Sequence, residues 1–488
     1  MISMLSLFFC LFETNAEASP VSVGGYMRVM TRPDLQGGSG TLGYWNLYGR
    51  LLNERPYASL DLKMDLLPDQ QNGLPWTKLY TRIEGNSIGG ADSQNGSLQS
   101  FRLSQAYLLS GNVGLKNVQW RLGTQESFFG DMGLYDMRPA EILWGVVGIS
   151  ARHLTERSEL ILAAGDAGYT QLGNNYNTIF TGAGTFRYRP LNGLEFGFGG
   201  RYNFEKGTQG NRNSPYATPT ISYEDFLRGE IVQNYMQENP YQAIEFPDPE
   251  LRDASSYKAV GYLGFGGFGP IIWNNFYATY EKLHPEKMRQ ESYQGQTYDI
   301  FVTDLTDERT RILLGNEIQL KIIPRRLDLA WGVLYGDQRD GDNNIAPSDF
   351  DRIYKSTVLR SQIYIKPTFH LLLESSVASE FSRNGNAFRE HADSIFANTN
   401  GLSNTRGFEY GDTDTRYTWQ GKGGIVLNPT GVGIFARPSL RFLYGSQYSN
   451  QNNAFGNSFV ETVNQYNDFG NVEQHWHHLF AVETEAWF

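Results

Sequence analysis

Apolar and polar residues alternate along most of this 488-residue chain, and this pattern limits the fold more than any other feature. Within 57–66, every even position is apolar, whereas the odd positions carry polar residues or tyrosine. The same period of two returns in 194–204, 317–322 and 327–335. Because successive side chains of a strand point to opposite faces, these segments predict strands with one apolar and one polar face.

The connections between these segments are of two kinds. Short ones with turn-forming residues lie at 190–193, 324–326 and 428–431. Long ones rich in Asn, Gln, Ser, Asp and Gly lie at 205–256, 282–308, 337–354, 380–414 and 446–474. Short turns at one end and long polar loops at the other are typical of outer-membrane β-barrels. A closed sheet suits hydrocarbon because it leaves no backbone N–H or C=O unpaired.

Counting the alternating segments predicts an all-β protein, a transmembrane antiparallel β-barrel of about 18 strands. The expected strands lie near 20–30, 57–67, 76–86, 100–110, 118–127, 147–154, 159–166, 181–189, 194–204, 257–267, 271–281, 309–323, 327–336, 355–366, 368–379, 415–427, 432–445 and 475–488. The barrel pattern begins near the start of the chain. We therefore expect no N-terminal plug domain of the kind that active transporters carry.

Composition agrees with a barrel and disfavours other classes. Charged residues make up 19% of the chain, aromatic residues 14%, and glycine contributes 53 residues. The net charge is −11 and no basic stripe occurs, so we expect no nucleic-acid partner. The body of the chain has no long apolar run, which excludes a bundle of membrane-spanning helices.

The N-terminus predicts export. Residues 4–12 form a short apolar core, and Ala16-Glu17-Ala18 provides the small residues that a signal peptidase needs. We expect a signal peptide over 1–18, an outer-membrane barrel domain over 19–488 and localisation in the bacterial outer membrane. Residues 1–3 carry no Lys or Arg, so a different start codon and a plain apolar N-terminus stay open. Cys10 is the single cysteine, and the mature chain would have no disulfide and no thiolate.

The C-terminal segment 480–488 alternates in the same way. Its even positions are apolar and suit lipid, whereas Glu483, Glu485 and Trp487 suit a wet interior. An alternating last strand that ends in phenylalanine, here Phe488, resembles the end that the barrel-assembly machinery recognises in bacterial outer-membrane proteins. We expect this machinery and outer-membrane lipid as partners.

Motifs for catalysis or cofactors are weak. The glycines at 264–269 satisfy a dinucleotide fingerprint on paper, but they lie at a strand end with no helical pattern after them. His475, His477 and His478 fall on two faces of the last strand, which disfavours a metal site. We found no metalloprotease, nucleophile-elbow, phosphate-loop or paired-cysteine motif. The sequence therefore predicts neither an enzyme nor a cofactor.

Several short stretches resemble the maltoporins and related carbohydrate porins. They are Gly-Tyr-Met-Arg at 25–28, Phe-Arg at 101–102, Trp-Arg-Leu-Gly at 120–123 and 130–138. The resemblance covers about 20–150 and the last dozen residues. It implies a homotrimer of 18-stranded barrels whose third loop folds inward over 130–138. It also implies that sugars pass along aromatic residues flanked by ionisable groups.

The resemblance assigns individual positions. Tyr26, Tyr57 and Trp487 match aromatic residues along which sugars move in that family. Arg28, Arg102, Asp131 and Asp136 match its ionisable track, and Arg50 does so more loosely. Arg138 replaces a central tyrosine and Phe129 an arginine, so the transported sugar does not follow from the family. Arg82 and Glu141 complete the candidate set, as a lumen cation and a neighbour of the third loop.

Each assignment has a plainer alternative. The three aromatics could lie at the membrane interface, packed on lipid headgroups. The cations Arg28, Arg82, Arg102 and Lys78 could simply solvate a water-filled lumen. Asp131, Asp136, Arg138 and Glu141 could form ion pairs that hold the third loop to the wall, which is compatible with a role in the constriction.

Together these features predict a passive outer-membrane channel for sugars or oligosaccharides. A general porin, or one selective for anions and acidic solutes, is the first alternative, since Arg28, Arg50, Arg82, Arg102 and Arg138 would favour anions if they cluster. An outer-membrane barrel enzyme is the second alternative, and the high strand count disfavours it.

Overall fold

The computed structural model describes 20–36, 40, 42–43, 45–69, 73–85, 101–168, 178–206, 220–222, 253–284, 288–293, 296–301, 309–339, 352–382, 415–450 and 475–488. The predicted signal peptide, and most of the long polar connections, lie outside the described residues.

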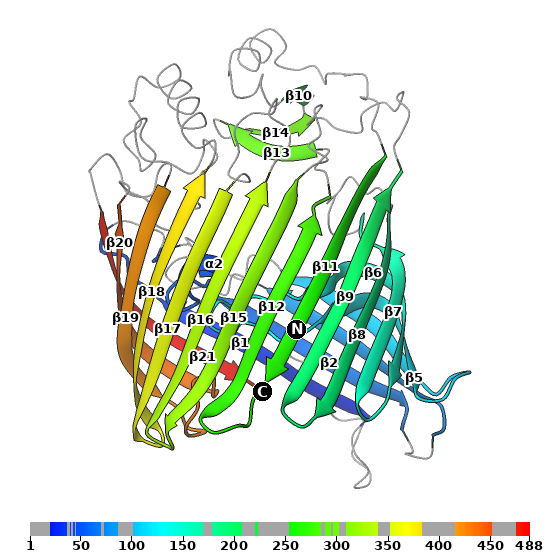
Figure 1. Ribbon diagram of the computed structural model, residues 1–488, viewed down its shortest axis with the longest axis horizontal. Coiled ribbons are helices and arrows are strands. Elements are labelled where there is room, and N and C mark those ends of the chain that lie inside the picture. Colours follow the sequence, from blue (N-terminus) through cyan, green and yellow to red (C-terminus); the bar gives the residue numbers. More distant parts are fainter. Residues whose placement is uncertain are drawn as a thin grey trace, which may run out of the picture.

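Eighteen antiparallel strands form one closed barrel (Figure 1). Each strand pairs with its neighbours along the chain, and β1 closes the ring by pairing with both β2 and β21. The strands are β1 (Val21–Thr31), β2 (Tyr57–Leu67), β3 (Trp76–Gly85), β4 (Phe101–Gly111), β5 (Val118–Phe128), β6 (Glu141–Leu154), β7 (Ser158–Asp166), β8 (Ile179–Leu191), β9 (Leu194–Glu205), β11 (Ala254–Phe265), β12 (Ile271–Lys282), β15 (Thr310–Ile323), β16 (Leu327–Arg339), β17 (Arg352–Lys366), β18 (Phe369–Ser382), β19 (Thr415–Leu427), β20 (Ser439–Ser449) and β21 (Trp476–Trp487). The predicted fold class and strand count are confirmed.

Three further strands form a separate small sheet in the order β10–β14–β13. They are β10 (Thr220–Ser222), β13 (Met288–Tyr293) and β14 (Gln296–Phe301). Figure 1 shows them above one mouth of the barrel, in connections that the sequence predicted as loops. Among the described residues, no helix is both long enough and apolar enough to cross a membrane.

The side chains of each strand alternate between the two faces of the wall as predicted. On β2, Leu60 and Leu66 are exposed on the outside, whereas Ser59, at an odd position next to Leu60, is buried inside. Further exposed apolar residues of the outer face are Leu122, Ile149, Leu162, Phe198, Trp331, Leu359 and Phe480. This outer surface is apolar and the inner one carries most of the buried charge, which is the inverse of a soluble β-protein.

Two predicted strand boundaries are wrong. The strand expected over 147–154 begins earlier, at Glu141. The strand expected over 432–445 begins only at Ser439, because the preceding backbone finds partners within its own turn. There Asn428 Nδ2 donates to the Ala436 carbonyl at 3.0 Å and Thr430 Oγ1 to the Arg437 carbonyl at 3.1 Å. These carbonyls therefore need no strand partner.

Of the connections that the structure describes, three fold into the barrel instead of leaving it: the described part of 32–56, 129–140 and 428–438. The second is the inward-folded third loop that the maltoporin resemblance implied, and the structure confirms it. The segment 32–56 carries the short helix α2 (Trp45–Tyr48). Apolar residues from all three segments pack in one core against the inner face of β11–β18, and Leu134 and Tyr135 are fully buried there.

Candidate functional site

Tyr26, Tyr57 and Trp487 lie side by side on the inner wall, and we call them the aromatic row. They come from β1, β2 and β21, the strands that close the barrel. The ring centroids of Tyr26 and Tyr57 are 5.8 Å apart, and those of Tyr26 and Trp487 are 5.0 Å apart. Trp487 is directly opposite Tyr26 in the β1–β21 ladder, so both side chains lie on the inner face, where Trp487 stays 60% exposed. A place at the outer membrane interface is therefore excluded for this row.

Hydrogen bonds hold the two tyrosines by their hydroxyl groups. Tyr26 donates to Glu485 Oε1 at 2.6 Å, and Tyr57 donates to Glu84 Oε2 at 2.8 Å. Both carboxylates are buried in the inner wall. Because its hydroxyl is hydrogen-bonded, each ring keeps one orientation and presents a flat apolar face. A ligand that stacks on this face therefore does not have to reduce the conformational entropy of the side chain.

Arginines and carboxylates form a dense network beside the aromatic row. Arg28 and Arg50 both approach Glu54 Oε2, at 2.7 Å and 3.0 Å. Arg50 also pairs with Glu485 at 2.9 Å, and Arg437 pairs with the same carboxylate at 2.6 Å. Arg50 is itself buried, so it acts inside this network and does not line open water.

The other predicted wall arginines are paired as well. Arg82 lies 2.6 Å from Asp61, and Arg102 lies 2.8 Å from Glu84, the acceptor of the Tyr57 hydroxyl. The Arg102 side chain is 73% exposed, which makes it the most accessible of the predicted cations in the network. Because each guanidinium sits against a carboxylate, this wall presents alternating charges and little net charge of either sign.

The third loop carries the remaining predicted residues across the barrel. At one end, the carbonyl of Asp131 accepts hydrogen bonds from Asn275 Nδ2 at 2.9 Å and Tyr277 Oη at 2.8 Å, both on β12. Asp136 Oδ2 lies 3.9 Å from Arg28 Nη1, close to the aromatic row. The segment therefore reaches from β12 to the wall that carries the row and narrows the bore.

Arg138 and Glu141 lie where the third loop joins β6. Arg138 pairs with Glu126 at 2.7 Å and covers the Phe128 ring. Arg138 and Glu141 line a cavity of about 210 Å³ together with Lys258. They are thus not in contact with the aromatic row, although they belong to the same inward segment.

Burial sets the charge state of the carboxyl groups in the inward segments. Burial raises the pKa of Glu54 to about 8, against the pull of Arg50 and Arg28. Burial also acts to raise the pKa of Asp136, but its hydrogen bond with Glu54 and the charge of Arg50 bring it below its ordinary value. Glu54 thus holds a proton at neutral pH and Asp136 does not.

The sequence did not reveal that 32–56 and 428–438 fold inward. The first is anchored by Tyr48, whose hydroxyl donates to Glu380 at 2.7 Å and whose carbonyl accepts from Lys422 Nζ at 2.9 Å. In the second, Ile434 is buried and Phe435 lies under the Arg360 guanidinium. A signal was present in 32–56: its leucines at 42, 47, 51 and 52 do not alternate and are too apolar for a solvated loop.

The clustered histidines separate as predicted. His477 points inward, where its Nε2 lies 2.9 Å from Asp34, whereas His478 is on the outer face against Tyr444. Among the described residues, no group of three or more His, Cys, Asp or Glu side chains could hold a metal ion.

No protein-family model and no curated protein matches this chain. Solved structures do match over nearly its whole length. OprD of Pseudomonas aeruginosa is 9% identical, with a TM-score of 0.42, over 98% of this chain and 97% of that one. The outer membrane channel DcaP of Acinetobacter baumannii is 11% identical, with a TM-score of 0.36, over 98% and 99%. Wzi of Escherichia coli, a carbohydrate-binding β-barrel involved in group 1 capsule assembly, is 13% identical, with a TM-score of 0.39, over 95% and 84%.

DcaP and Wzi are outer-membrane proteins, and none of the three is named as a maltoporin. The resemblance of this chain to the maltoporins therefore stays a prediction from its sequence.

Proposed function

We propose that this protein is a passive channel of the bacterial outer membrane and that sugars or oligosaccharides pass along its aromatic row. The observation that carries the proposal is the contact between Tyr57, Tyr26 and Trp487 on the inner wall, with ion pairs on either side. The closed barrel with an apolar exterior supports the location in a membrane, since every strand finds two partners.

The chemistry of the row suits a pyranose. A sugar ring has a flat C–H face that stacks on Tyr or Trp and a rim of hydroxyls that bond to charged groups. Aromatic packing contributes about 0.5–1.5 kcal/mol and each charge-assisted hydrogen bond about 1.5–3 kcal/mol. Their sum must stay modest because a channel has to release its solute. We expect millimolar binding, about −4 kcal/mol.

The pairing of charges favours uncharged solutes over simple ions at this wall. Arg82 and Arg102 each face a carboxylate within 3 Å. Paired charges bind hydroxyl groups without producing a field of one sign. For this reason the paired charges near the aromatic row support a sugar channel better than a general anion-selective porin.

The test is the single-channel conductance of the purified protein in a planar bilayer. Maltodextrins, sucrose, glucose and a dicarboxylate are titrated in turn. Saturable block by at least one sugar at millimolar concentration is the expected result. A conductance that no sugar changes would contradict the proposal, and block by the dicarboxylate alone would favour the acidic-solute alternative. Hydrolysis of lipid by the same preparation would favour the enzyme alternative.

A further inference from the structure

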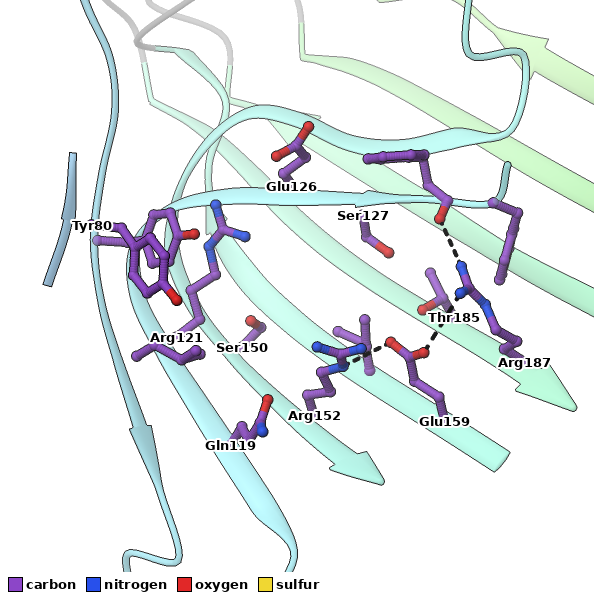
Figure 2. A pocket seen from close by; sticks show the side chains of 15 residues that line it. Tyr80, Gln119, Arg121, Glu126, Ser127, Ser150, Arg152, Glu159, Thr185 and Arg187 are labelled. Carbon is purple, nitrogen blue, oxygen red and sulfur yellow. Dashed lines mark hydrogen bonds and ion pairs between the residues drawn. The ribbon is translucent and has the colours of Figure 1, made fainter. Parts of the chain in front are cut away.

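A partly open pocket lies on the inner wall, away from the aromatic row. It is a cavity of about 390 Å³ between β3–β8 and the start of the third loop, and we call it the Arg121 chamber. Figure 2 shows polar and charged side chains pointing into it from several strands, among them Arg121, Arg152, Glu159 and Arg187. Its volume falls in the range of small-molecule sites, about 300–1,000 Å³.

Arg121 is held flat at one end of this chamber. Its guanidinium lies 3.6 Å from the ring centroid of Tyr107, and Tyr107 stacks on Tyr80 with centroids 4.9 Å apart and planes 9° from parallel. Arg121 Nε donates to the Thr124 carbonyl at 2.7 Å. The stack and this hydrogen bond fix the plane of the guanidinium, so its terminal nitrogens point in a set direction.

Those terminal nitrogens are unused in the described structure. Arg121 Nη2 is buried and makes no hydrogen bond to any residue that the structure describes. No described carboxylate lies within ion-pair distance of Arg121. A buried, unsatisfied donor on a charged group costs free energy, which a bound acceptor would recover.

The two carboxylates of the chamber do not compensate this charge, because both have other partners. Glu159 lies 2.8 Å from Arg152 and 3.9 Å from Arg187. Glu126 pairs with Arg138 at 2.7 Å. The chamber therefore keeps an excess of positive charge at Arg121, in contrast to Arg82 and Arg102 near the aromatic row, which each face a carboxylate.

Neutral donors and acceptors also line the chamber, beside apolar residues such as Leu109 and Ile161. Gln119, Ser127, Ser150 and Thr185 contribute amide and hydroxyl groups. Arg121 is directly opposite Ser150 in the β5–β6 ladder, so both side chains lie on the same face of the wall. A ligand with one carboxylate and several hydroxyls would satisfy this arrangement.

We propose that the Arg121 chamber binds the carboxylate of an acidic sugar, a uronate. The carboxylate accepts hydrogen bonds from the Arg121 terminal nitrogens, and the ring hydroxyls bond to the neutral side chains. This inference goes beyond the aromatic row, since it assigns a second site on other strands. It rests on the proposed function in one respect: the proposed function is the reason why we take the molecule that carries the carboxylate to be a sugar.

The test compares digalacturonate with its dimethyl ester, which has the same rings and no charge, as blockers of the channel in a planar bilayer. In the wild-type protein, the acid should block at about tenfold lower concentration than the ester, as expected for one charge-assisted hydrogen-bond pair. Arg121→Gln should abolish this difference. The matched control is Arg157→Gln, which removes one positive charge from the exposed turn between β6 and β7 and should keep the difference.

Equal block by acid and ester in the wild type, or an unchanged difference in Arg121→Gln, would overturn the inference. Folding of each variant is checked by the shift of the unheated protein on a gel. If Arg121→Gln does not fold, Arg121→Lys replaces it: it keeps the charge but lacks the planar fork, and should lose most of the difference. Maltotriose in the same bilayer reports on the aromatic row. If maltotriose does not block the channel but the acid blocks it in a way that depends on Arg121, the proposed function is rejected and the uronate site in the Arg121 chamber is supported.

Discussion

The Tyr57 ring is restrained from two sides, by the hydroxyl bond to Glu84 and by the neighbouring ring of Tyr26. Tyr57→Ala removes one ring from the row and leaves the backbone ladder intact. We expect sugar block to weaken about three- to tenfold, the equivalent of one aromatic contact. Tyr202→Ala, which removes an exposed tyrosine from the outer face of β9, is the control and should leave the block unchanged. Unchanged block in Tyr57→Ala would remove the row from the translocation path.

Glu54 makes the charge of the constriction depend on pH. Because burial raises its pKa to about 8, the carboxyl is neutral at pH 6 and ionised at pH 9. Arg28 and Arg50 keep their charge over this range, so the region loses one net positive charge as the pH rises. The preference for cations over anions, measured as the reversal potential in a salt gradient, should increase between pH 6 and 9. In Glu54→Gln the reversal potential should not change between pH 6 and 9. A change as large as in the wild type would exclude Glu54 as its cause.

At this scale the sequence predicted the direction of side chains but not their partners. Alternation was enough to place Tyr57 inside and Leu60 outside, since a strand leaves no third choice. The bond from Tyr26 to Glu485 joins residues 459 positions apart and depends on the register of the closing strands. The stack that presents Arg121 depends on two further strand registers in the same way. Periodicity carries no information on register.

Among the elements, the third loop depends on glycines in the wall opposite. A Cβ at Gly332 on β16 would lie 2.7 Å from Tyr135 Cε2 and 3.3 Å from Leu134. Gly332→Ala should therefore loosen the loop, at a cost of about 1–3 kcal/mol. We expect a larger and noisier single-channel conductance. Gly182→Ala is the control, since nothing lies within 4 Å of its Cβ position. If Gly332→Ala conducts like the wild type, the loop does not set the bore.

The elements that the sequence missed are those held by tertiary contacts alone. The segment 428–438 contains the turn signal Asn-Pro-Thr-Gly, and its beginning is a turn as predicted. Its second half packs Ile434 and Phe435 into the barrel instead of starting a strand. Nothing local distinguishes these two outcomes, because apolar residues of a strand and of a buried loop look alike over a few positions.

For the whole molecule, closure of the barrel depends on close contact between Gly25 on β1 and Phe488 at the end of β21. Gly25 N donates to the Phe488 carbonyl at 2.9 Å, and the Phe488 ring covers Gly25. A Cβ at Gly25 would lie 2.6 Å from the Ser59 carbonyl oxygen as well as against that ring. Gly25→Ala should lower the folded fraction, or the urea midpoint, more than Gly24→Ala, where the nearest atom is at 3.4 Å. Equal effects of the two substitutions would show that this seam tolerates an added side chain.

The number of strands was predictable because every pair of neighbours along the chain is also a pair in space. In an up-and-down barrel, each alternating segment followed by a turn adds one strand, and no crossover can hide or reorder it. The small sheet of β10, β13 and β14 escaped prediction since it lies in polar segments without a period of two.

The pairing of β1 with β21 also imposes an order in time. One of the two strands that pair with β1 is β21, which lies more than 450 residues later in the chain. Until that neighbour arrives, one edge of β1 stays open and could pair with a strand of another molecule. Unclosed copies of this protein must consequently be kept apart until β21 has paired with β1, and crowding of such copies is the condition under which assembly should fail first.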